Sequence, residues 1–179
     1  ASNANTRQQG SQTMVVRRPG STASAVPREL RGAQFKIVPI PGKGMGVVAT
    51  SRIHRGERIM ADPPLLVVTE GLTDKSLAAL VARLPIPLRR AFFNLAQNTA
   101  RFGEEKTSLG IVATNGIPYM HHGVRSGGIF PTACRINHSC DANAAYKWHA
   151  LLAQLTVHAS KTIDCGDEIT FNDPFGRAH

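Results

Sequence analysis

The side chains best suited to chemistry lie in residues 134–144, CRINHSCDANA, which contain two cysteines, a histidine, an arginine and two asparagines. Thiolates and imidazoles are zinc ligands. Six residues of the chain could supply them to one site: His121, His122, Cys134, His138, Cys140 and Cys165. Structural zinc sites usually carry a C-x-x-C pair, however, and this chain has none. We therefore expect no metal at this segment.

Covalent catalysis by a nucleophile is the second chemistry that this segment suggests. Ser139 and Cys140 follow His138 directly. Adjacent side chains usually point apart, and catalytic triads are assembled by the fold rather than by neighbouring positions. The order His-Ser-Cys therefore does not favour a hydrolase. A buried polar turn, in which Asn137 bonds to its own backbone, is the structural alternative.

A glycine-rich loop, GKGMG at residues 42–46, is the third candidate site. It lacks the four-residue gap and the Gly-Lys-Ser/Thr ending of a phosphate-binding loop, and no helix follows it as a dinucleotide fingerprint requires. The glycines could simply form a turn between two strands. They could also leave the backbone bare enough for a ligand to approach closely.

The composition indicates one basic domain. The chain has 179 residues and a formal net charge of +9, which suggests acidic partners such as nucleic acid, an acidic protein face or a membrane surface. No apolar run approaches the roughly 18 residues that cross a bilayer, and the N-terminus has neither an apolar signal segment nor a Met. We expect a fragment or a processed chain, intracellular and soluble, with three free thiols, in the nucleus or the cytoplasm.

Residues 1–33 differ in character from the rest, because small, polar and basic residues predominate there. Glu29 is outnumbered by six nearby cations: Arg7, Arg17, Arg18, Arg28, Arg31 and Lys36. We expect a disordered basic arm over 1–33, one domain over 34–175 and a short truncated end over 176–179. A solvated arm is the simpler interpretation, and a weak contact with nucleic acid is the alternative.

The elements that must position these motifs are short strands around a helical segment. β-Branched runs broken by glycine and proline predict strands at 35–40, 46–51, 58–68 and 168–172, and a hairpin over 144–163. Apolar residues three and four apart predict helices at 73–84, 88–101 and 108–115, with a glycine-rich loop at 123–128. Three apolar residues of the hairpin are expected in the core: Leu151, Leu155 and Val157. The pattern is that of an α+β fold, mainly β.

Taken in order, these motifs resemble the SET domain of protein-lysine methyltransferases, and most of all a branch that is common in fungi and related to the SET-and-MYND group. Four stretches carry the resemblance: the opening half at 42–68, a Thr-Asn strand or turn at 111–119, the diagnostic motif at 127–144, and the final strand at 163–171. The resemblance covers roughly residues 35–173. It implies several short-stranded sheets, a helical insertion over 72–102 and a knot-like C-terminal part.

The resemblance also implies a reaction, the transfer of a methyl group from S-adenosylmethionine to a lysine of a protein, with histone as one candidate. Six residues stand at the family's cofactor positions: Lys43, Gly44, Met45, Asn115, Asn137 and His138. Three more stand at the family's lysine channel: Ile117, Phe171 and Phe175.

The sequence departs from the family pattern at three points, of which the first and the last bear on activity. Asp173 stands where the family has a tyrosine, and Ala142 stands where proline is usual. A carboxylate near the reaction centre would favour the charged, non-nucleophilic form of the substrate lysine, so we expect reduced activity or support from another group. The chain also stops at His179 without a cysteine-rich segment, which predicts Cys140 to be a buried thiol without zinc. A degenerate SET domain that binds cofactor or protein without turnover is the alternative.

Overall fold

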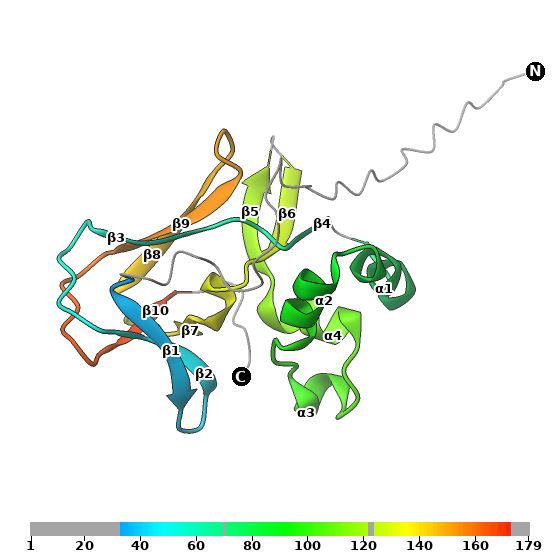
Figure 1. Ribbon diagram of the computed structural model, residues 1–179, viewed down its shortest axis with the longest axis horizontal. Coiled ribbons are helices and arrows are strands. Elements are labelled where there is room, and N and C mark those ends of the chain that lie inside the picture. Colours follow the sequence, from blue (N-terminus) through cyan, green and yellow to red (C-terminus); the bar gives the residue numbers. More distant parts are fainter. Residues whose placement is uncertain (1–32, 70, 122–123, 173–179) are drawn as a thin grey trace, which may run out of the picture.

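The computed structural model describes residues 33–69, 71–121 and 124–172, and it places two β-sheets side by side with the helices beside the smaller sheet (Figure 1). The arm over residues 1–32 and the end over residues 173–179 lie outside the described residues. The described part is mainly β, as the sequence pattern predicted. None of its helices is long and apolar enough to cross a membrane.

The larger sheet has its strands in the order β1-β2-β10-β8-β9-β3, with β7 also paired to β10. Its strands are β1 (Phe35–Ile40), β2 (Gly44–Ala49), β3 (Arg58–Asp62), β7 (Asn137–His138), β8 (Ala144–His149), β9 (Gln154–Ala159) and β10 (Glu168–Phe171). β1 and β2 form one predicted hairpin, and β8 and β9 form the other. These two predictions are confirmed, because β-branched runs around a glycine turn, or local alternation of apolar and polar residues, are enough to define a hairpin.

Strand β10 joins the two hairpins, because it pairs with β2, β7 and β8. Its first half is antiparallel to β2, with Glu168 opposite Val48. Its second half is parallel to β7, with Thr170 opposite Asn137, and also parallel to β8. The C-terminal strand therefore lies beside both the glycine-rich turn and the Asn-His segment.

The prediction of one strand over 58–68 is wrong. The segment forms two strands, β3 and β4 (Leu66–Thr69), which belong to different sheets. Pro63 and Pro64 stand between them, and a proline has no N–H to donate to a ladder. The chain therefore leaves the larger sheet at Asp62 and enters the smaller one at Leu66.

The smaller sheet has the order β4-β6-β5, with β5 at Ile117–His121 and β6 at Val124–Ile129. The prediction of a glycine-rich loop at 123–128 is thus wrong from Val124 onward. Glycine is needed in this strand because of its aromatic neighbours: a Cβ on Gly128 would lie 2.4 Å from the Phe130 ring and 2.9 Å from the Tyr119 ring. The low strand propensity of glycine concealed a strand that tight packing requires.

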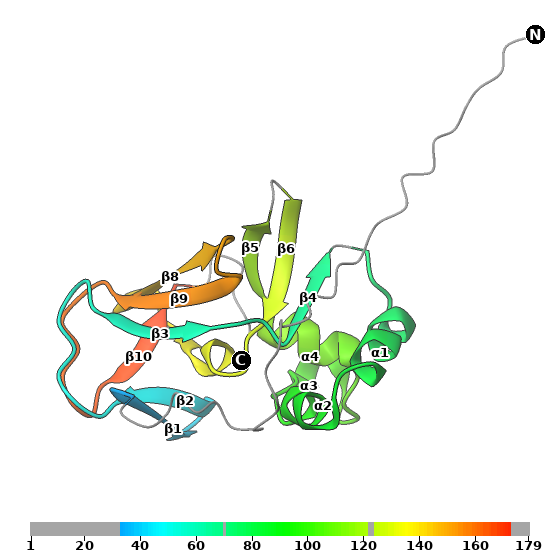
Figure 2. The ribbon, with the colours of Figure 1, turned by 45° about the horizontal axis from the view of Figure 1, so that its top comes forward.

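Four helices cover one end of the described structure, as the view in Figure 2 shows. They are α1 (Asp74–Ala82), α2 (Ile86–Phe93), α3 (Thr99–Phe102) and α4 (Ser108–Asn115). The prediction of a single helix over 88–101 is wrong. Helix α2 ends at Phe93, with Asn94 as its C-cap, and α3 begins at Thr99. Asn98 accepts from the Arg101 N–H at 3.0 Å and so begins a new helix.

Gln97 holds the loop between α3 and α4 against α4. Its Nε2 atom donates to Gly103 O at 2.9 Å and Glu105 O at 2.8 Å, and its Oε1 atom accepts from Thr107 N at 2.9 Å. A Cβ on Gly110 would lie only 2.2 Å from that Oε1 atom.

Gly110→Ala should therefore lower the free energy of unfolding, by about 1–3 kcal/mol, because Gln97 cannot move without breaking these bonds. Urea denaturation measures the change. Ala113→Ser, at an exposed position of the same helix, is the control and should change stability by less than about 0.5 kcal/mol. Equal stability of the Gly110 variant and the wild type would show that Gln97 is free to rearrange.

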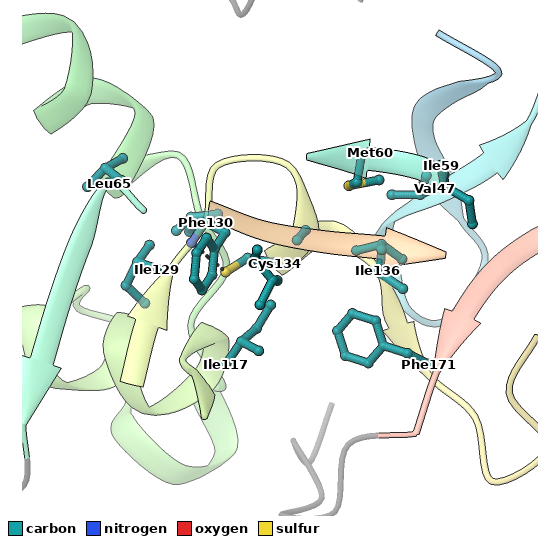
Figure 3. Packing of buried hydrophobic residues seen from close by; sticks show 14 of the residues in the cluster. Val47, Ile59, Met60, Leu65, Ile117, Ile129, Phe130, Cys134, Ile136 and Phe171 are labelled. Atoms are coloured by element: carbon teal, nitrogen blue, oxygen red, sulfur yellow. Dashed lines mark hydrogen bonds between the residues drawn. The ribbon is translucent and has the colours of Figure 1, made fainter. Parts of the chain in front are cut away.

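One hydrophobic cluster runs through both sheets and the helices (Figure 3). Its large, fully buried side chains include Phe92 from α2, Phe130 after β6 and Phe171 from β10. Leu155 and Val157 are completely buried, as predicted. The prediction of Leu151 as a core residue is wrong: it lies in the turn between β8 and β9 and is fully exposed. The alternation of buried and exposed side chains in β8 and β9 does not continue through the turn, so it could not predict whether Leu151 is buried.

Candidate functional site

The turn between β1 and β2 meets β7 and β10 at the side chain of Glu168. Lys43 Nζ lies 2.8 Å from Glu168 Oε2, and Asn137 Nδ2 donates to Glu168 Oε1 at 2.8 Å. The Glu168 side chain is 19% exposed and the Lys43 side chain is 44% exposed. Two predicted cofactor residues that are far apart in the sequence, Lys43 and Asn137, therefore share one carboxylate in the fold.

The glycines of the GKGMG loop serve two different purposes. Gly42 and Gly44 have φ angles of +74° and +73°, the left-handed region that glycine adopts without strain, and nothing lies within 4 Å of a Cβ built on either. Gly46 is buried instead. A Cβ there would lie 2.5 Å from Ile40 Cγ1, 3.0 Å from Asn137 Nδ2 and 3.1 Å from Glu168 Oε1. The first two glycines make the turn, and the third lets Asn137 and Glu168 approach β2.

Open backbone lies next to Lys43. Gly44 is exposed, and Met45, which pairs with Pro39 of β1, is 40% exposed. The space around Gly44 is clear of other heavy atoms to 4 Å from a built Cβ. A ligand could therefore contact the backbone of the turn directly, and the cofactor contacts that the resemblance implies for Lys43, Gly44 and Met45 stay a prediction.

Asn143 fastens the chain after β7 to β10. Its Nδ2 atom donates to Glu168 O at 2.8 Å, and its Oδ1 atom accepts from Thr170 N at 2.9 Å. Ser139 N adds a bond to Phe171 O at 3.2 Å. The amide of Asn143 thus bonds to β10 on both sides of Ile169, as a neighbouring strand would, and fixes β7 next to the glycine-rich turn.

His138 and Cys140 form a contact that the sequence did not predict. His138 Nε2 lies 3.4 Å from Cys140 Sγ. The prediction that Cys140 is buried is wrong, because the thiol lies in the exposed turn after β7. Within the described residues, no three His, Cys, Asp or Glu side chains are grouped as metal ligands.

Asn115 lies at the end of α4, and its side chain is directed into the helical part. Its Nδ2 atom donates to Ala96 O at 2.7 Å and Ile111 O at 2.8 Å. The backbone carbonyl of Asn115 accepts from the Cys134 thiol at 3.0 Å, which links α4 to the segment before β7. Both amide hydrogens of Asn115 are therefore used within the protein, and a contact with cofactor stays a prediction.

The predicted channel residues Ile117 and Phe171 are buried in the same cluster (Figure 3). Tyr146 connects their surroundings: its ring packs edge-on against Phe171 with centroids 5.2 Å apart, and its hydroxyl donates to Pro118 O at 3.2 Å. Tyr146 of β8 thus contacts β10 at Phe171 and β5 at Pro118, the residue after Ile117. Phe175 and Asp173 lie outside the described residues.

Tyr119 stacks on Trp148 with ring centroids 4.3 Å apart, and burial raises the pKa of its hydroxyl to about 12. An acid whose folded pKa is raised stabilises the fold below its unfolded pKa of 10.0, and this stability is lost as the pH rises toward 12. We expect absorbance at 295 nm, which follows the two tyrosines of the chain, to show a step near pH 12 that Tyr119→Phe removes. A step near pH 10 that disappears instead would contradict the buried position of this hydroxyl.

Comparison with known proteins identifies the family. The family model of the SET domain matches residues 44–172. The chain belongs to the SET-domain family. The histone-lysine N-methyltransferase set5 of Schizosaccharomyces pombe is 33% identical over 135 residues, which cover 75% of this SET-domain chain and 40% of that protein. The chain therefore spans well under half the length of this curated relative.

The fold of the SET domain is also found in a solved structure. The SET domain of LSMT bound to lysine and AdoHcy superposes with a TM-score of 0.56 at 15% identity, over 80% of this chain and 50% of that chain. At this identity the likeness shows the fold alone. It confirms the SET fold that the sequence motifs predicted.

Sequence analysis missed three residues of the site: Glu168, Asn143 and Tyr146. Glu168 looked like one residue of a strand, and its partner Lys43 is 125 positions away. A structural role of Asn143 could have been predicted, because an asparagine side chain has both a donor and an acceptor and can pair with a strand as a backbone amide does. Tyr146 gave no signal, since an aromatic residue in a hairpin is ordinarily a packing residue.

Proposed function

We propose that this SET domain is an S-adenosylmethionine-dependent protein-lysine methyltransferase. The observation that supports it most is the junction of the β1–β2 turn, β7 and β10, where Lys43, Asn137 and Glu168 meet beside exposed glycine backbone. Family membership supports the same reaction class.

The residues at this junction fit the amino-acid end of S-adenosylmethionine. Lys43 presents a half-exposed ammonium that can bind a carboxylate. The amide oxygen of Asn137 has no hydrogen-bond partner within the described part of the chain and can accept from an ammonium. Gly44 and Met45 are the exposed first residues of β2, and their backbone can line the rest of the nucleoside.

When bound, the cofactor supplies a sulfonium methyl group for in-line transfer to an amine. The protein must deliver that amine in its neutral form. The buried side chains of Ile117 and Phe171 provide an apolar environment, which disfavours the ammonium form of a lysine. Tyr146, whose ring packs against Phe171 and whose hydroxyl donates to Pro118 O, can restrict the position of the amine.

The substrate belongs to the same proposal. The S. pombe relative is named as a histone-lysine methyltransferase, and a basic histone tail in the nucleus, or another lysine-containing protein in the cytoplasm, is the substrate class that we propose. The likeness to the fungal branch near the SET-and-MYND group stays part of this proposal and rests on the four stretches at 42–68, 111–119, 127–144 and 163–171. Asp173 should lower the rate without abolishing cofactor binding, for the electrostatic reason given above.

Transfer of a labelled methyl group from S-adenosylmethionine to mixed histones and ribosomal proteins tests this function. We expect incorporation into lysine by the wild type, more by Asp173→Tyr and none by Asn137→Ala. Cofactor binding without incorporation by either the wild type or Asp173→Tyr would favour a non-catalytic binding module instead.

The weak nucleic-acid contact of residues 1–33 also stays a proposal, and DNA binding that does not weaken steeply with salt would contradict it.

A further inference from the structure

Both carboxylate oxygens of Glu168 are used, each toward a different element of the site. Oε2 is 2.8 Å from Lys43 Nζ in the β1–β2 turn, and Oε1 accepts from Asn137 Nδ2 of β7 at 2.8 Å. The backbone of Glu168 is fixed as well, since it pairs with Val48 and its carbonyl accepts from Asn143. The carboxylate is therefore held at a defined position between a cation and an amide.

This position determines which way the Asn137 amide faces. An ionised carboxylate only accepts hydrogen bonds, so the amide nitrogen of Asn137 must point toward it and the amide oxygen must point away. Asn137 is only 3% exposed, and its Nδ2 atom lies 3.0 Å from where a Cβ on Gly46 would be, so the side chain is closely packed and its main freedom is an exchange of the amide nitrogen and oxygen. Without the carboxylate, the amide could rotate by 180° and present a donor instead of an acceptor.

The same carboxylate restrains Lys43. The lysine side chain stands at the tip of a hairpin and is 44% exposed, so it would otherwise sample many rotamers. Bound to Glu168 it stays near Asn137 while two of its three N–H donors can still reach a ligand. One acidic side chain thus positions an acceptor and a cation next to each other.

We propose that Glu168 is a positioning residue of the cofactor site, which acts mainly by fixing the orientation of the Asn137 amide. This inference rests on the proposed function. The ligand class that it serves is an α-amino acid group, whose ammonium is accepted by Asn137 Oδ1 and whose carboxylate is bound by Lys43. Glu168 itself contacts neither the reacting atoms nor the ligand.

Two substitutions separate orientation of the amide from the charge of Glu168. Glu168→Gln keeps an oxygen that can accept from Asn137 but loses the ion pair with Lys43. Glu168→Ala loses both. Asp164→Ala is the matched control, because it removes an exposed carboxylate that is paired with Arg52 at 3.3 Å, away from the junction. Calorimetry with S-adenosylhomocysteine gives the Kd of each variant, and thermal unfolding shows that each is folded.

We expect Glu168→Ala to raise the Kd about tenfold or more, Glu168→Gln to raise it by less than Glu168→Ala, and Asp164→Ala to stay within about threefold of the wild type. In an Asn137→Ala background, Glu168→Ala should add less than about twofold, because the amide that it orients is absent. A purely structural carboxylate would give equal losses in Glu168→Ala and Glu168→Gln, and the full loss again in the Asn137→Ala background. Either result would overturn the proposal.

NMR of the Asn137 side-chain amide gives a readout that needs no cofactor. In the wild type its Nδ2 protons should exchange slowly with solvent, because Asn137 is buried and donates to Glu168. In Glu168→Ala they should exchange faster and have changed chemical shifts. Unchanged signals in Glu168→Ala would contradict the orienting role even if S-adenosylhomocysteine binds. A wild type that shows the expected amide signals but binds no S-adenosylhomocysteine would contradict the proposed function instead.

Discussion

Gly46→Ala is expected to weaken S-adenosylmethionine binding by about 100-fold while the chain stays folded. The added methyl group would overlap Ile40 Cγ1 at 2.5 Å and press on Asn137 Nδ2 and Glu168 Oε1 at 3.0 and 3.1 Å. All three neighbours are side chains packed at the junction, so relief of the overlap is expected to displace Ile40, Asn137 or Glu168. Each of these movements disturbs the proposed contacts with the cofactor.

Calorimetry measures this loss, and Gly42→Asn is its control. Gly42 belongs to the same loop and has a φ angle of +74°, but nothing lies within 4 Å of a Cβ built there. Asparagine tolerates the left-handed conformation better than other residues with a side chain, so the control should keep its affinity within about threefold. If both variants bind equally well, close packing at Gly46 has no part in the site.

Asp62→Ala is expected to have the largest effect on stability, a loss of about 3 kcal/mol in the free energy of unfolding. Asp62 ends β3 and is 3% exposed. Its Oδ2 atom accepts from Thr132 N at 2.7 Å and Ala133 N at 2.8 Å, at the start of the short helix that precedes β7. The substitution would leave two buried N–H groups without their acceptor and would loosen the segment that carries Asn137.

Thermal unfolding should show a decrease in Tm of roughly 6–12 °C for Asp62→Ala, and a smaller decrease for Asp62→Asn, which keeps one accepting oxygen. The control is Asp141→Ala, because Asp141 is 94% exposed and pairs only with Lys161 at the surface. It should change the free energy of unfolding by less than about 0.5 kcal/mol. A Tm for Asp62→Ala as high as that of Asp141→Ala would show that the helix needs no acceptor there.

The elements that local sequence determines were predictable, and those that distant pairing determines were not. Residues 35–51 contain β-branched runs on either side of a glycine-rich turn, and residues 144–159 alternate, so both hairpins could be predicted from local sequence. β6 was not predicted because Gly127 and Gly128 have low strand propensity. Its pairing depends on β4, which is distant in the sequence, and on β5, which directly precedes it. The break after Asp62 depended on two prolines whose effect was underestimated.

The site shows the same division. Lys43 and Asn137 were named from their motifs, and the fold brings both to one carboxylate. Glu168 and Asn143 were missed, because their roles come from contacts with chain segments that only the packed sheet brings together. Asn115 was named from its motif as well, yet its amide hydrogens bond within the helical part. A motif indicates which residues belong to a site, but it does not show which of their atoms are free to bind a ligand.

Titration of the isotope-labelled chain with S-adenosylmethionine, followed by backbone NMR, tests the central claim most directly, because it reports both binding and its place. We predict saturable shifts in the turn at 42–46, in β7 and in β10, and none of comparable size in α1 or α2. An absence of shifts in the folded chain, or shifts confined to the helices, would contradict the assignment of this junction as the cofactor site.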